Sequence, residues 1–144
     1  MRKTLRRLLW MVTLSVAAPV LAGQYEVVSS QVQRMLTQAA RNDEAGLNAT
    51  RQQLENLAGP AHRNVKEART LNQQGLDALK RNDYQAAATA FQKAQEADPA
   101  DVEVAGNLGY ANLKLGQFKR AEHQLAYAIS LSPGRSSSWY NLGQ

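Results

Sequence analysis

Residues 107–118 read Asn-Leu-Gly-Tyr-Ala-Asn-Leu-Lys-Leu-Gly-Gln-Phe, and the pattern to which they belong returns every 34 residues. A fixed period of about 34 residues is typical of stacked helical hairpins, in which each repeat packs on its neighbours. Because no segment alternates apolar and polar residues as a strand does, the sequence predicts an all-α protein. The positions that recur at this interval are Gly75, Gly109 and Gly143; Ala87 and Ala121; Ala94 and Ala128; and Pro99 and Pro133.

Turn residues divide the second half of the chain into repeats at 68–101 and 102–135 and a partial copy at 136–144. Glycine and asparagine tolerate the left-handed backbone with which many helices end, and proline cannot continue a helix. The helices expected here span residues 61–81, 84–97, 102–115 and 118–131, with the start of another at 136–144.

This arrangement resembles the tetratricopeptide repeat family over residues 68–144. The resemblance implies an α-solenoid of stacked antiparallel helical hairpins that winds into a right-handed superhelix. The residues that carry the resemblance are Asn107 to Ala111, Leu113 to Phe118, Ala121, Ala128 and Pro133 in one copy; Leu71, Gly75, Ala78, Tyr84, Ala87, Phe91, Ala94 and Pro99 in the copy before it; and Trp139, Asn141, Leu142 and Gly143 in the copy after it.

Each recurring position has a packing role. Small residues allow the two helices of a hairpin to approach closely, and large apolar residues fill the space between one hairpin and the next. Burial of one Phe or Leu side chain stabilises the fold by about 1.5–3 kcal/mol. The expected small residues are Gly75, Ala87, Gly109 and Ala121, and the expected large ones are Tyr84, Phe91, Phe118 and Leu125.

Residues 23–60 depart from the repeat pattern. Two amphipathic helices, expected over residues 24–41 and 44–57, flank Asn42-Asp43, but Leu47 and Arg51 do not suit the slots that they occupy. We interpret this segment as a degenerate or capping helical hairpin.

The last expected helix lacks a partner. Trp139, Tyr140 and Leu142 would expose apolar surface if residues 136–144 ended the stack alone. Two explanations stay open: the chain is part of a longer repeat protein, or this end meets a partner or a second copy of the chain.

Residues 1–22 have the pattern of an export signal. A charged start, Met1–Arg7, precedes the uncharged apolar run Leu8–Leu21, and cleavage is expected between Ala22 and Gly23. The run is short for a membrane span, which needs about 20 residues. We therefore expect a periplasmic or secreted protein of bacterial type, with an uncleaved inner-membrane anchor as the alternative.

The charge distribution argues against nucleic-acid binding. The net charge is +5, but four of the 17 basic residues lie in the first seven positions, which leaves residues 23–144 with 13 basic and 12 acidic residues. A nucleic-acid binder gathers basic residues on its folded part. Membrane contact is expected only through an uncleaved N-terminal segment.

No constellation of catalytic residues is apparent. The chain has no cysteine, and its two histidines, His62 and His123, fall in different hairpins and are expected to face solvent. The glycines fit turns and helix crossings, and Ser136-Ser137-Ser138 fits a helix start. We therefore expect neither an enzyme nor a metal or cofactor site.

The resemblance implies a concave groove, lined by the first helix of each hairpin, that holds a peptide or protein segment. Within it, Asn107 and Asn141 are expected to hydrogen-bond an extended backbone, Tyr110 to anchor a side chain, and Lys80 and Lys114 to meet carboxylates. The alternative is that these residues form an ordinary solvated helix face. The groove candidates are Arg69, Asn72, Leu76, Lys80, Glu103, Asn107, Tyr110, Leu113, Lys114, Tyr140, Asn141 and Gln144.

These features favour a scaffold or adaptor that binds proteins in the bacterial cell envelope, in secretion, pilus or envelope assembly. A self-associating structural subunit and an N-terminal fragment of a longer repeat protein are the alternatives. A third hypothesis is a subunit of an enzyme whose catalytic part lies elsewhere.

Overall fold

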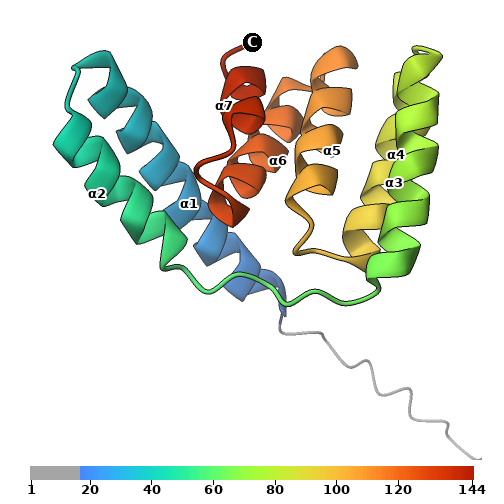
Figure 1. Cartoon of the computed structure of the whole chain (residues 1–144), viewed down its shortest axis with the longest axis horizontal. Helices are drawn as coiled ribbons and strands as arrows, with labels where there is room; N and C mark the ends of the chain where they lie inside the picture. Colours follow the sequence, from blue (N-terminus) through green and yellow to red (C-terminus); the bar gives the residue numbers. More distant parts are fainter. Residues whose placement is uncertain (1–16) are drawn as a thin grey trace, which may run out of the picture.

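The computed structural model describes the backbone of residues 17–144 and the side chains of residues 26–144. This part of the chain holds seven helices and no strand, which confirms the all-α prediction (Figure 1). Most of the expected export signal, residues 1–16, lies outside the described residues. The helices are α1 (Ala17–Ala40), α2 (Glu44–Glu55), α3 (Val65–Lys80), α4 (Tyr84–Ala97), α5 (Val102–Lys114), α6 (Phe118–Leu131) and α7 (Ser136–Leu142).

Local sequence sets the turn inside each hairpin. The second residue after the first helix of each hairpin adopts a positive φ, at Asn42 (54°), Asn82 (58°) and Gly116 (70°). These residue types adopt the left-handed conformation at the lowest cost. The side chains of Asp43 and Asp83 then accept hydrogen bonds from the backbone N–H groups that open α2 and α4, at 2.9 and 3.0 Å.

Two glycines allow the helices of each full repeat to cross closely. A Cβ built on Gly75 would lie 2.6 Å from Cδ1 of Phe91, and one built on Gly109 would lie 2.6 Å from Cγ of Leu125. Phe91 is fully buried and Leu125 is 1% exposed. Each large side chain therefore occupies the volume that a side chain at the glycine would need.

The interior differs from the prediction at two of the four large residues. Phe118 is 68% exposed at the start of α6, so the expectation that it fills the space between hairpins is wrong. Tyr84 is only partly buried, and its hydroxyl donates to Oδ1 of Asn82 at 3.1 Å. Both residues open a second helix directly after the hairpin turn, at the edge of the packed interface between hairpins.

The first hairpin does not stack in sequence order. Hairpin α3–α4 packs on α5, and α5–α6 packs on α7, but α1 and α2 make their contacts on α6. Figure 1 shows α1–α2 at one end of the stack and α3–α4 at the other, with residues 56–64 crossing the base between them. The stacking of neighbours in sequence order that the 34-residue period predicts for the repeats therefore does not extend to α1–α2.

This placement covers the end of the stack that the sequence left bare. Trp139 and Leu142 of α7 pack against a buried aliphatic cluster, so the expectation that they lack a helical partner is wrong. Only Tyr140, 70% exposed, keeps the expected exposure. The cluster joins the first hairpin to α6 and consists of Val28, Val32, Met35, Leu54, Ala126 and Ile129.

Helix α1 runs through the expected cleavage point. Its backbone is helical from Ala17 onward, so Ala22 and Gly23 lie inside a continuous helix. Within residues 17–144, no helix has both the length and the apolar character that crossing a bilayer requires.

Truncation of Phe91 tests the packing of the repeats. We expect Phe91→Ala to lower the free energy of unfolding by about 3–5 kcal/mol, because it leaves a cavity above Gly75. Phe118→Ala, at the exposed aromatic position, should change it by less than about 0.5 kcal/mol. Urea unfolding followed by circular dichroism measures both values, and equal losses in the two variants would contradict this assignment of the core.

Candidate functional site

The first helices of the repeats form one layer of the stack. Helix α5 contacts α3 on one side and α7 on the other. We call the outward surface of this layer the first-helix face. It carries most of the residues that the sequence predicted for a groove, namely Arg69, Asn72, Lys80, Glu103, Asn107, Tyr110, Lys114 and Tyr140.

Side-chain amides connect neighbouring helices on this face. Nδ2 of Asn107 on α5 donates to Oδ1 of Asn72 on α3 at 3.0 Å, and Nδ2 of Asn72 donates to Oε1 of Glu103 at 3.3 Å. An asparagine amide has two N–H donors and a carbonyl acceptor. The pair therefore fixes both side chains and still leaves one N–H of each, and the carbonyl oxygen of Asn107, for a ligand.

An aromatic side chain and a cation lie one turn farther along α5. Nζ of Lys114 lies 5.3 Å from the centre of the Tyr110 ring, which is within the range of a cation–π contact. Tyr110 is partly buried, whereas Lys114 is exposed. The contact holds the ammonium group beside the ring, so that an apolar surface and a positive charge are offered together.

Three predicted groove residues have other roles. Leu76 packs against the core cluster around Phe91, so it offers little surface. Nζ of Lys80 lies 2.9 Å from Oδ1 of Asp77, and the hydrogen bonds from Lys80 and Gln73 lower the pKa of that carboxyl. Asn141 lines a different hollow, described next.

Two hollows flank helix α6. The larger, of about 560 Å³, lies between α4 and α6 and is bordered largely by amide side chains, of which Gln95 donates to Oε1 of Gln124 at 2.9 Å. The smaller, of about 300 Å³, lies between α1, α6 and α7. Its lining includes Leu113, Asn141 and Gln144, which places these three predicted groove residues away from the amide pair of the first-helix face.

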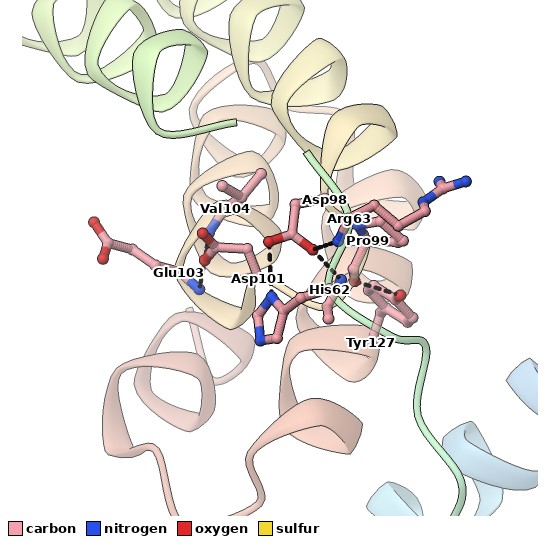
Figure 2. A network of polar contacts seen from close by, with 9 residues as sticks. His62, Arg63, Asp98, Pro99, Asp101, Glu103, Val104 and Tyr127 are labelled. Atoms are coloured by element: carbon pink, nitrogen blue, oxygen red, sulfur yellow. Dashed lines mark hydrogen bonds and ion pairs between the residues drawn. The ribbon is translucent and has the colours of Figure 1, made fainter. Parts of the chain in front are cut away.

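A buried carboxylate organises the start of α3 (Figure 2). Asp98 is fully buried at the end of α4, and its Oδ2 lies 2.7 Å from Nδ1 of His62. Oδ1 of Asp98 also accepts from the backbone N–H groups of Ala100 at 3.3 Å and Arg63 at 3.4 Å. The expectation that His62 faces solvent is confirmed, since its side chain is 65% exposed. The expectation that it lies on a helix is wrong, because it lies in the segment before α3 and contacts the turn after α4.

This contact anchors the segment before α3. The backbone N–H of Asn64 donates to the backbone carbonyl of Ala97 at 3.1 Å. The guanidinium of Arg63 donates to the backbone carbonyl of Glu96 at 3.2 Å. The partners lie more than thirty residues apart, so no local pattern could have revealed them. Residues 61–64 are consequently linker, although the sequence assigned them to a helix.

Among the side chains of residues 26–144, no hydroxyl or thiol group hydrogen-bonds to the histidine–carboxylate pair. The nearby hydroxyl of Tyr127 donates to the carbonyl of Pro99 at 2.7 Å, and burial together with the charge of Asp98 raises the pKa of that hydroxyl (Figure 2). Within residues 17–144, no group of three or more His, Cys, Asp or Glu side chains is arranged to hold a metal ion. The pair is therefore best understood as a structural anchor.

Burial acts to raise the pKa of the Asp98 carboxyl, but the hydrogen bonds from His62, Ala100 and Arg63 outweigh it and hold that pKa below its ordinary value of 3.8. A carboxyl whose pKa is lower in the folded protein stabilises the fold above its ordinary pKa. That contribution is lost as the pH falls through the folded-state value.

Comparisons with known proteins agree with the repeat architecture. Residues 72–136 match a family model described as tetratricopeptide repeat. Among solved structures, the chain is similar to the first TPR of Spaghetti (RPAP3) bound to the HSP90 peptide SRMEEVD, with a TM-score of 0.56 and 24% identity over 58% of this chain and 67% of that chain. These matches confirm a helical repeat fold of tetratricopeptide type.

Replacement of Asp98 tests the anchor. At pH 7 we expect Asp98→Asn to lower the free energy of unfolding by about 1–3 kcal/mol, because it weakens several buried charge-assisted hydrogen bonds. The difference from the unmodified protein should shrink as the pH falls below 3.8, the ordinary carboxyl pKa. Urea titrations between pH 7 and pH 3 measure this difference. The control is Asp77→Asn, at an exposed ion pair, whose free energy of unfolding should stay close to that of the unmodified protein. A gap for Asp98→Asn that is unchanged across this range would contradict the assignment.

Proposed function

We propose that the protein is an adaptor without chemistry of its own, which holds an extended segment of a partner protein on its first-helix face. The observation that carries this proposal is the amide pair Asn72–Asn107, fixed across two helices beside Tyr110 and Lys114. The solved tetratricopeptide structure to which the chain is similar has a peptide bound, which supports the same use of the fold.

The chemistry of the face suggests how such a segment would bind. The free N–H groups of Asn72 and Asn107 suit the carbonyl groups of an extended backbone, which repeat along a strand. Tyr110 offers a flat apolar surface for a side chain, and Lys114 offers a positive charge to a carboxylate. Glu103 accepts a hydrogen bond from Asn72, which orients its carboxylate but leaves the negative charge on this face.

We also propose that the protein acts in the bacterial cell envelope. The support is the charged start and apolar run of residues 1–22, which fit an export signal. We expect fractionation to place the mature protein in the periplasm and N-terminal sequencing to begin at Gly23. Recovery of a chain that begins at Met1 from the membrane fraction would favour the anchored alternative, and recovery from the cytoplasm would contradict export.

A double substitution tests the face. We expect Tyr110→Ala combined with Lys114→Ala to abolish binding of a partner protein. The melting temperature should change by only a few degrees, since neither side chain is fully buried. The control is Phe118→Ala combined with Lys119→Ala, which removes an exposed aromatic residue and an adjacent lysine from α6. Affinity purification with each variant, followed by mass spectrometry, identifies the proteins retained.

The expected partner is retained by the unmodified protein and by the α6 control but lost from the α5 variant. A synthetic peptide from that partner, titrated into each form, should bind the unmodified protein and the α6 control with similar affinity and the α5 variant more weakly. Retention of the same proteins by all three forms would contradict binding at the first-helix face.

A further inference from the structure

Helix α1 covers α6 at the end of the stack. The hollow between α4 and α6 is lined by Ala88, Gln92 and Leu108, and the hollow between α6 and α1 is lined by Glu122, Ala126 and Leu142. Each residue of the second set lies 34 positions after its counterpart in the first, which is one repeat. The repeat register therefore continues to this end of the stack, but α1 packs directly on α6, as α6 does not on α4, and its backbone does not approach α7. It covers the end of the stack in a position of its own, and not in that of the second helix of a third hairpin.

The cap that α1 provides is aliphatic and incompletely fitted. Val28, Val32 and Met35 of α1 meet Ala126 and Ile129 of α6 in one buried cluster. The hollow of about 300 Å³ remains beside them. In the same helix, Oε1 of Gln31 is buried without a hydrogen-bond partner. Aliphatic contact of this kind depends on complementary surfaces, and not on which molecule supplies the helix.

The first hairpin is a unit that can move without losing its own contacts. Helices α1 and α2 pack on each other, and the buried hydroxyl of Thr50 donates to Oε1 of Gln38 at 3.0 Å. Beyond α2, residues 57–64 are all exposed and contain Gly59-Pro60. The backbone N–H groups of Asn56 and Leu57 still bond to α2, and His62 on Asp98 fixes the far end of this segment, so the free hinge is residues 58–61.

The linker also limits the placement of the hairpin within one chain. The nine residues 56–64 span at most about 30 Å when fully extended. Within one molecule they must cross the base of the stack, from α2 at one end to α3 at the other (Figure 1). A hairpin that docks on another molecule is not bound by this requirement.

From these contacts we propose that the protein forms an exchanged dimer, in which the α1–α2 hairpin of each copy caps the α6–α7 end of the other. A second copy is the occupant that the surface fits, because an identical hairpin makes the identical aliphatic contacts and only the hinge changes. The dimer presents two first-helix faces, so it would bind a partner with repeated segments more tightly than one copy does.

Single cysteines test the exchange, because the natural chain has none. Gln33 on α1 and Glu122 on α6 line the same hollow and are both exposed. We expect Gln33→Cys mixed with Glu122→Cys, co-refolded from urea at high concentration and treated with a short bis-maleimide, to yield a covalent dimer. The control mixture of Gln33→Cys with Lys93→Cys, on exposed α4, should not.

The double variant Gln33→Cys with Glu122→Cys in one chain shows whether the reagent spans the gap. If it cross-links within one chain while the mixed single variants give no dimer above the Lys93 control, the exchange proposal is overturned. A covalent dimer from the mixed single variants supports it.

Linker length gives an independent readout that does not use cysteines. Deletion of residues 58–60 should make the dimer the main species in light scattering, because shortening the linker from nine to six residues cuts its maximum reach to about 20 Å and disfavours the crossing within one molecule. Insertion of six Gly and Ser residues after Gly59 should favour the monomer at the same concentration. If the folded deletion variant stays monomeric at every concentration, the proposal is overturned.

Discussion

The structure depends on the pairing of a glycine with a large apolar side chain at each helix crossing. Phe91 lies against Gly75, and Leu125 lies against Gly109, with no room for a Cβ at either glycine. This spacing is the same in both full repeats, so successive hairpins present equivalent surfaces and stack regularly. The alignment of α3, α5 and α7 follows from it, and this alignment brings Asn72 within hydrogen-bonding distance of Asn107.

A stack of repeats also needs its ends covered, and here the N-terminal hairpin α1–α2 covers the C-terminal end of the stack. The hairpin that precedes the repeats packs on α6, and the linker behind it is anchored by His62 on the buried carboxylate of Asp98. The anchor marks the end of the hinge on the side of α3. The contacts of residues 62–64 at the base of the stack thus set the point about which the first hairpin could move.

The candidate site was predictable in its residue types and only partly in its geometry. The family resemblance placed Asn72, Asn107 and Tyr110 on first helices, and the structure joins the two asparagines directly. Leu76 and Asn141 were assigned to the same face, but Leu76 packs on the core and Asn141 borders the hollow under α1. The slot in a repeat says which helix a residue belongs to, whereas its exposure depends on what packs against that helix.

The sequence by itself determined the hairpins, because their signals are local: the 34-residue period, the aspartate caps, and Asn42, Asn82 and Gly116 at positive φ. Only the tertiary structure decided where the first hairpin docks. Val28, Val32 and Met35 show that α1 needs an apolar partner, but the pattern is satisfied equally by either end of the stack. The docking of α1 on α6 depends on the fit of surfaces that are far apart in the sequence and on the reach of the linker. Neither can be predicted from a short stretch of residues.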